Sequence, residues 1–194
     1  MSLSLREQFG DIDIYLFDQL LKGRIRPGMR IFDAGCGGGR NLVYLLREGY
    51  EVFGVDSDER AVVAMSRRVP GHFRHEGVEA TSFDAEFADV VISSAVLHFA
   101  RDDRQFEAML RGSWRVLKPG GLFFCRLASS IGIEQQVQPL GDNRYLLPDG
   151  SERYLVTAEA LMLATEELGA QLLDPLKTTV VENQRSMTTW VLRK

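Results

Sequence analysis

The sequence is poor in the features that mark secreted or membrane-bound proteins. Its 194 residues include two cysteines, Cys36 and Cys125, which are too few for a disulfide framework. No apolar run approaches the ~20 residues needed to cross a bilayer, and residues 1–10 lack the apolar stretch of a signal peptide. We therefore expect a cytoplasmic protein without a membrane partner.

Positive charge is not in excess either. Lys and Arg number 23 against 27 Asp and Glu, which gives a formal net charge of −4. Proteins that bind a phosphate backbone usually carry a basic excess or patch, so we expect no nucleic-acid partner. The three histidines have no Asp or Cys at ligand spacing, and we expect no metal site. Without a docking module for RNA or protein, a small-molecule substrate is the expected partner.

What is present is a regular alternation of short apolar runs with helical periods. Hydrophobic residues make up 45% and charged residues 26%, as in soluble globular proteins. The alternation predicts one α/β domain with a mostly parallel sheet. Predicted helices cover 11–22, 42–46, 61–69, 103–117 and 158–168, and predicted strands cover 30–34, 51–55, 72–74, 88–93 and 122–127.

The last third of the chain departs from this rhythm. Residues 129–156 are polar and loop-like, with a turn at Pro148-Asp149-Gly150. Lys177–Glu182 and Met187–Leu192 indicate two strands that pair antiparallel. Earlier in the chain, Pro119-Gly120 predicts a type II turn. We expect a single domain over 1–194, with an N-terminal helical region at 1–27, a core at 28–128, an insert at 129–156 and a final part at 157–194.

A glycine-rich turn at Asp33–Asn41 is the most informative stretch. A strand leads into Asp33, the glycines turn the chain, and a helix is expected to start at once. Glycine lets a ligand approach the backbone, and the N–H groups of a helix start would face it. Asp56 ends the next strand, about 20 residues on, where an acidic side chain accepts ribose hydroxyls. The pattern predicts a nucleotide site at the carboxyl ends of adjacent strands.

The charges in this turn select among nucleotides. A dinucleotide fingerprint would place glycine or alanine at position 40, which is Arg40 here. Asp33 would repel a pyrophosphate but could hold the ammonium of an amino acid. S-adenosylmethionine carries an ammonium, a sulfonium and a ribose but no phosphate, so the charges favour it over the nicotinamide cofactor of an oxidoreductase.

Four motifs in this order resemble those of class I S-adenosylmethionine-dependent methyltransferases. They are Ile31–Asn41, Val55–Ser57, Asp89–Ser94 and Leu117–Gly121, and the resemblance covers roughly residues 28–128. The segments Gly39–Asn41 and Val96–Phe99 are similar to the tellurite-resistance and thiopurine-type small-molecule enzymes.

The resemblance implies a Rossmann-like seven-stranded sheet with helices on both faces and an antiparallel C-terminal strand. It implies that Gly35 and Gly37 pass under the methionine part and that Asp56 binds the ribose. Gly77 and Val78 would flank the adenine, although the family usually has an acidic residue where this chain has Gly77. The expected cofactor residues are Asp33, Ala34, Gly35, Cys36, Gly37, Asn41, Asp56, Ser57, Gly77, Val78, Ser94 and Ala95.

The expected activity is methyl transfer to a small molecule, and a catalytically silent cofactor-binding module is the alternative. Methyl transfer depends largely on alignment of donor and acceptor, so the family needs no dedicated catalytic residue. His98 is the candidate general base, or else a histidine that binds a backbone group. The insert should contact the acceptor, with the candidates Arg144, Tyr145, Arg153 and Tyr154.

Several neighbouring side chains allow two interpretations. Asn41 either contacts the cofactor or lies on a helix surface, and Arg40 is expected to be a solvated residue of the first helical turn. Cys36 is expected to contribute its backbone only. Phe9 and Tyr15 in the N-terminal helix either close over the cofactor as a lid or pack on the sheet.

Overall fold

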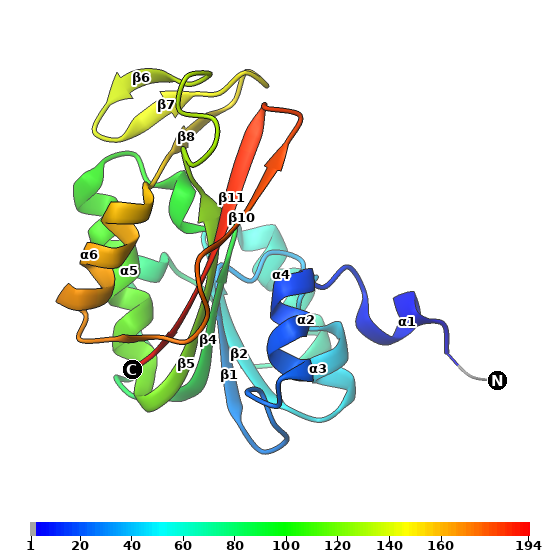
Figure 1. Cartoon of the computed structure of the whole chain (residues 1–194). Helices are drawn as coiled ribbons and strands as arrows, with labels where there is room; N and C mark the ends of the chain where they lie inside the picture. The colour runs from blue at the N-terminus through cyan, green and yellow to red at the C-terminus, as the bar shows by residue number, and fades with distance from the viewer. Residues whose placement is uncertain (1–2) are drawn as a thin grey trace.

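The computed structural model describes residues 3–194, and Met1 and Ser2, which belong to the predicted N-terminal region, lie outside the described residues. A central sheet has helices on both faces (Figure 1). The helices are α1 (Leu5–Phe9), α2 (Ile14–Leu21), α3 (Val43–Arg47), α4 (Glu59–Arg68), α5 (Asp103–Val116) and α6 (Ala158–Glu167), with short 3-10 turns η1 (Val78–Ala80) and η2 (Leu97–Phe99).

The strands of the main sheet follow the order β10-β11-β5-β4-β1-β2-β3. Their bounds are β1 (Arg30–Ala34), β2 (Glu51–Asp56), β3 (Phe73–His75), β4 (Ala88–Ser94), β5 (Leu117–Ala128), β10 (Lys177–Val181) and β11 (Arg185–Arg193), and the two-residue β9 (Gln171–Leu172) also pairs with β11. All neighbouring strands among β1 to β5 pair parallel. In contrast, β11 runs antiparallel to both β5 and β10. This confirms the predicted mostly parallel sheet with an antiparallel C-terminal strand.

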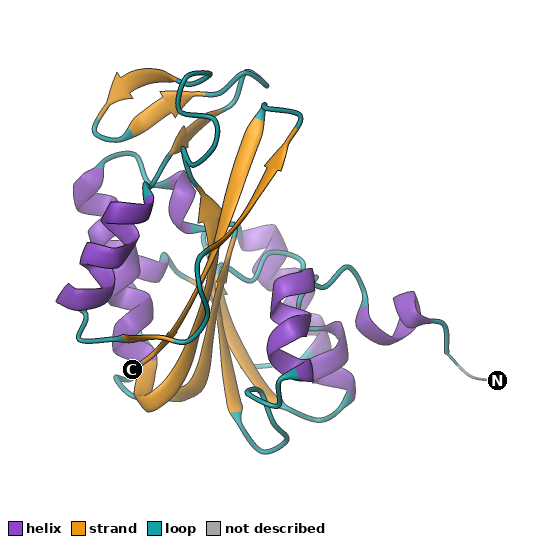
Figure 2. Cartoon of the chain, viewed as in Figure 1, coloured by secondary structure: helices purple, strands orange, loops and turns teal. Residues whose placement is uncertain are grey.

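Alternation along each strand divides the core between the two faces of the sheet. In β1, Ile31 faces the side that α2, α3 and α4 cover, while Phe32 faces the side of α5 and α6. Figure 2 shows these helices in two separate layers. Both residues are fully buried. No helix within residues 3–194 combines the length and apolar character of a membrane span.

The segment 129–156 is not the loop that its polarity suggested. It forms a second, antiparallel sheet from β6 (Gln138–Gly141), β7 (Arg144–Leu146) and β8 (Glu152–Tyr154). Asp142 and Asn143 both have positive φ, 50° and 55°, as a two-residue hairpin of type I′ requires. Their short polar side chains tolerate this conformation, and this was the turn signal that sequence reasoning overlooked. The predicted turn at Pro148–Gly150 does join β7 and β8 (Figure 1).

The turn predicted at Pro119-Gly120 lies within a strand, not before one. Leu117 already pairs with Ala88 of β4, and Leu122 resumes the pairing with Val90. Lys118–Gly121 therefore face a single residue, Asp89, and bulge from the sheet. Gly120 has φ +77°, which glycine adopts readily. Leu117 accordingly belongs to β5 and not to the preceding helix.

Candidate functional site

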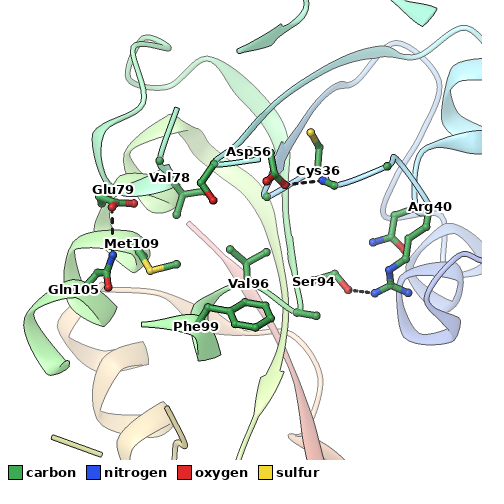
Figure 3. A pocket seen from close by; sticks show the side chains of 17 residues that line it. Cys36, Arg40, Asp56, Val78, Glu79, Ser94, Val96, Phe99, Gln105 and Met109 are labelled. Carbon is green, nitrogen blue, oxygen red and sulfur yellow. Dashed lines mark hydrogen bonds between the residues drawn. The ribbon is translucent and has the colours of Figure 1, made fainter. Parts of the chain in front are cut away.

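A pocket of about 500 Å³ opens where β1, β2 and β4 end. Its volume lies within the range of small-molecule sites. Figure 3 shows side chains from the β1–α3 loop, the end of β2, η1, the β4–η2 segment and α5 around it. The lining residues are Gly35, Cys36, Gly37, Gly38, Arg40, Asn41, Asp56, Ser57, Gly77, Val78, Glu79, Ser94, Ala95, Val96, Phe99, Gln105 and Met109. Ten of the twelve expected cofactor residues are among them, and Asp33 and Ala34 are not.

The glycine-rich loop is open toward this pocket only in part. Gly35 has φ +90°, and a Cβ there would lie 2.4 Å from Val96 Cγ2. A Cβ at Gly37 would meet nothing within 4 Å. The loop runs through turns until α3 begins at Val43, so the expected helix start directly after the glycines was wrong. Backbone groups of the loop, not the end of a helix, face the pocket.

Asp56 is held in place by the backbone. Its Oδ2 accepts the Gly37 N–H at 2.7 Å, and its Oδ1 accepts the Asp58 N–H at 2.9 Å. An ionised carboxylate offers about four lone-pair positions, so two remain for hydroxyl donors in the pocket. The side chain is thereby oriented before any ligand arrives.

Asp33 is a carboxyl group without a partner. It is 2% exposed, and its side chain makes no hydrogen bond or ion pair within residues 3–194, although its oxygens are not among the fully enclosed atoms that lack a partner, which are Ser93 Oγ, Arg126 Nε and Thr189 Oγ1. Burial raises the pKa of Asp33 to about 8, with the positive charge of Arg40 opposing and the negative charge of Asp56 adding to the rise. Both of those charges line the pocket, so the Asp33 carboxyl is electrostatically coupled to it.

Arg40 is exposed, as the sequence suggested, but it lies in a turn before α3 and lines the pocket. Its Nη2 donates to Ser94 Oγ at 2.9 Å and lies 4.0 Å from Asp13 Oδ2. That Asp13 oxygen is already bound by Arg126 Nη1 at 3.0 Å. Two guanidinium groups thus lie near one carboxyl group, and a proton on Asp33 leaves this end of the pocket with an excess of positive charge.

Three other residues predicted to bind the cofactor make contacts within the protein or are buried. Asn41 is buried, and its Oδ1 accepts the Asp13 N–H at 2.9 Å, so it ties the start of α2 to the loop. Burial raises the pKa of the Cys36 thiol, which leaves it unreactive at neutral pH. The Ser57 carbonyl oxygen lies 3.0 Å from His75 Nε2, which gives that histidine a structural role.

His98 is 5% exposed, and its Nδ1 accepts the backbone N–H of Ala128 at 3.1 Å. Burial lowers the pKa of His98 to about 4, and the nearby charge of Arg153 lowers it further. The neutral imidazole therefore carries its proton on Nε2 and can donate but not accept there. This geometry favours the alternative interpretation, a histidine that binds a backbone group, and His98 does not line the pocket.

The four candidates in the insert lie on two faces of the small sheet. Tyr145 and Arg153 are register partners, and the Arg153 guanidinium lies 5.0 Å from the ring centroid of Phe99 at the pocket. Arg144 pairs with Glu152. Tyr154 is 6% exposed, and its hydroxyl donates to Asp103 Oδ1 at 2.9 Å. Only Arg153 is thus near the pocket through a contact with a lining residue.

The N-terminal aromatic residues pack and do not line the pocket. Phe9 stacks on Tyr44 of α3 at 4.9 Å and contacts Phe17 edge-on at 4.8 Å. The Tyr15 hydroxyl lies 2.9 Å from Thr179 Oγ1 on β10. This placement agrees with packing against the sheet and not with a lid.

Sequence reasoning missed five side chains of the lining. They are Glu79, Val96, Phe99, Gln105 and Met109. Met109 lies within the predicted helix 103–117, and Val96 and Phe99 belong to the segment that carries the finer resemblance. Glu79 follows the predicted adenine segment by one residue and accepts a 3.4 Å hydrogen bond from Gln105 Nε2. Its place beside Gly77-Val78 was the available signal.

The chain is similar to known methyltransferases in part of its sequence. A family model described as a methyltransferase domain matches residues 32–125. An uncharacterized methyltransferase of Synechocystis sp. is 36% identical over 100 residues, which are 51% of this chain and 47% of that protein. The chain therefore spans about half the length of this curated relative.

Two solved structures share the fold over nearly the whole chain. A methyltransferase described as SAM-dependent from Methanosarcina mazei has a TM-score of 0.74 at 20% identity and covers 90% of this chain and 96% of its own. The 1,6-didemethyltoxoflavin-N1-methyltransferase of Burkholderia thailandensis, solved with 1,6-didemethyltoxoflavin and S-adenosylhomocysteine, has a TM-score of 0.71 at 18% identity and covers 96% and 79%. At these identities the likeness shows a common fold.

Proposed function

We propose that this chain is a class I S-adenosylmethionine-dependent methyltransferase, which binds S-adenosylmethionine in the pocket described above and transfers the methyl group to a small-molecule acceptor. The product left in the pocket is then S-adenosylhomocysteine. The domain match, the strand order and the position of the pocket at the carboxyl ends of β1, β2 and β4 all support this function.

One observation carries the proposal: the buried carboxyl of Asp33 has no partner within the described chain. A buried polar group without a hydrogen bond is costly, so its retention at this place calls for a ligand that satisfies it. The ammonium of the cofactor's amino-acid part supplies such a donor. Arg40, which is 47% exposed, would bind the carboxylate at the same end of the ligand.

The other cofactor residues follow from the pocket's remaining walls. The free lone pairs of Asp56 would accept the ribose hydroxyls. Gly77 and Val78 would flank the adenine, and Glu79 beside them offers a carboxylate to its amine where Gly77 has no side chain. Gly35, Gly37, Ser94 and Ala95 would lie along the methionine part.

The chemistry requires alignment more than proton transfer. When bound, the cofactor supplies a methyl group already activated by a sulfonium. The chain's contribution is to orient donor and acceptor in an enclosed site, an effect worth up to about 7–11 kcal/mol in favourable systems. His98 would act by fixing the β5 backbone through Ala128 and not as a general base.

Thermal unfolding with S-adenosylhomocysteine and, separately, with NAD tests the binding part of this function. At a hundred times its Kd, a specific ligand stabilises by about 2.7 kcal/mol. We expect a higher Tm with S-adenosylhomocysteine and no change with NAD. Gly35→Val should lose the shift, because its side chain collides with Val96. A diphosphate ligand that stabilised the protein instead would contradict the proposal.

Methyl release from labelled cofactor across a panel of acceptors tests the transfer itself. A protein that binds the cofactor but stays silent with every acceptor would be the binding module that the sequence left open.

Arg40→Gln provides a test of the proposed tail contact. The variant keeps a hydrogen-bonding group for Ser94 but loses the charge, so its affinity for S-adenosylhomocysteine should fall about tenfold, as for one charged hydrogen bond. Its affinity for 5′-methylthioadenosine, which lacks the amino-acid part, should not change. Isothermal titration of both ligands checks this. An equal loss for both would show that Arg40 acts on the pocket as a whole.

A further inference from the structure

Phe99 presents an open aromatic face at the pocket. Its side chain lines the pocket although the residue is 62% exposed. The His98 ring lies 4.6 Å away at a tilt of 54°, and the Arg153 guanidinium is 5.0 Å from the Phe99 ring centroid. Figure 3 shows the Phe99 ring across the pocket from Asp56. A flat ring placed on such a face buries apolar area in a preferred geometry.

Arg153 makes no close ion pair within residues 3–194, although its charge acts at longer range on Asp149, which pairs with Arg185. Arg153 is half-buried, and its Nη1 donates to the Glu152 backbone carbonyl. Among residues 3–194 no carboxylate lies within ion-pair distance of it. Arg144 of the same small sheet, by contrast, pairs with the Glu152 carboxylate. A planar guanidinium beside an aromatic face, with no carboxylate of residues 3–194 bound to it, suits a ligand that carries a carboxylate on a flat ring.

Negative and positive side chains lie on different sides of the pocket. Its lining carboxylates are Asp56 and Glu79, and Figure 3 shows Glu79 on the opposite side of the pocket from Arg40. An anionic ligand is therefore repelled from the walls assigned to ribose and adenine. Arg40 is assigned to the carboxylate of the cofactor, so the Arg153 guanidinium beside Phe99 is the charge that attracts an anionic methyl acceptor.

From these contacts, and resting on the function proposed above, we propose that the methyl acceptor is a planar aromatic acid. Its ring lies on the Phe99 face, and its carboxylate pairs with the Arg153 guanidinium. The small sheet β6–β8, which carries Arg153, thereby takes part in acceptor recognition, while the glycine loop and Asp56 serve the cofactor.

Binding of three matched probes to the protein loaded with S-adenosylhomocysteine tests this inference. The probes are 4-hydroxybenzoate, the neutral planar 4-hydroxybenzamide, and the anionic but non-planar cyclohexanecarboxylate, each titrated while amide chemical shifts are followed by NMR. We expect 4-hydroxybenzoate to bind at least tenfold more tightly than either of the other two. Equal binding of the benzamide would overturn the anionic part, and equal binding of the cyclohexane acid would overturn the stacking part.

Two variants and a control locate the site. Arg153→Gln should lower the affinity for 4-hydroxybenzoate about tenfold and leave the benzamide unchanged, whereas Phe99→Leu should weaken both aromatic probes. Arg101→Gln is the matched control, because Arg101 is near Phe99 in sequence but is 77% exposed and lies 3.6 Å from the Asp102 carboxylate. Unchanged binding of 4-hydroxybenzoate by Arg153→Gln would overturn the inference.

The loading step separates the two proposals. If S-adenosylhomocysteine binds but 4-hydroxybenzoate does not, the acceptor class is wrong and the cofactor site stands. If S-adenosylhomocysteine itself does not bind, the proposed function fails and the acceptor class fails with it.

Discussion

Asp33→Asn should stabilise the ligand-free protein at pH 8 and at the same time weaken binding of S-adenosylhomocysteine. The pKa of Asp33 is raised to about 8 by burial, far above the ~3.9 of an unfolded chain. Between these values the folded state keeps a proton that the unfolded state loses. The free energy of unfolding therefore decreases as pH rises from about 4 to about 8, by up to ~1.4 kcal/mol per pH unit.

Asparagine removes this penalty because its amide does not ionise. Urea unfolding of both proteins should give equal stabilities near pH 4 and a more stable variant at pH 8. Isothermal titration should show a loss of about 10- to 100-fold in affinity for S-adenosylhomocysteine, as expected for one charged hydrogen bond of ~1.5–3 kcal/mol. A variant less stable than the wild type at pH 8 would mean that Asp33 has a structural partner.

The same titration predicts how binding depends on pH in the wild type. An ammonium ligand binds the ionised form of Asp33, so binding below pH 8 must release its proton. Affinity should rise toward pH 8, and calorimetry in two buffers of different ionisation enthalpy should detect the released proton. Asp33→Asn should show no such release, and a wild type without it would contradict the assignment of the ammonium to Asp33.

Asp13→Ala should produce the largest loss of stability, about 3–5 kcal/mol, as expected when one partner of a buried ion pair is removed. The Asp13 side chain is fully buried, and its Oδ2 is bound by Arg126 Nη1 at 3.0 Å. Its Oδ1 also accepts the Tyr15 N–H at the start of α2. Alanine leaves the Arg126 guanidinium, only 22% exposed, without a carboxylate. The midpoint of urea unfolding measures the loss.

Asp11→Ala is the matched control for this prediction. Asp11 is two residues away, its side chain is 73% exposed, and it lies 3.5 Å from Arg6, so its removal should change stability by no more than about 0.5 kcal/mol. The double variant Asp13→Ala with Arg126→Met should recover part of the loss, because no charge is left unpaired. Equal destabilisation by the two aspartate variants would rule out a special role for the Asp13–Arg126 pair.

The parts of the molecule that depend on local pattern were predictable from the sequence. The β1 bounds and the antiparallel pairing of β10 with β11 follow from apolar runs bounded by turn residues. Asp56 could be placed at the pocket because its position depends only on where β2 ends. Gly35 and Gly37 could be placed for the same reason, since they follow the end of β1 directly.

Features that depend on contacts between distant residues were not predictable. Arg40 enters the pocket because Ser94 and Asp13 attract it, and neither neighbour is evident from its surroundings in the sequence. His98 loses its free lone pair to a backbone N–H thirty residues away. The small sheet was missed for a different reason: its strands have only three or four residues, too few to show a clear alternation.

The small sheet also leaves and rejoins the core at one place. The Ser130 N–H donates to the Val156 carbonyl at 3.0 Å, and Ser129 and Val156 form a parallel bridge. The backbone contacts of residues 129 and 130 with residue 156 hold the two ends of the segment 131–155 close together. A longer, shorter or unrelated segment could therefore be substituted between them at little cost in loop-closure entropy. The chain thus has an exchangeable unit that carries Arg153 and is separate from the glycine loop, so a new acceptor preference could arise there without rebuilding the nucleoside site.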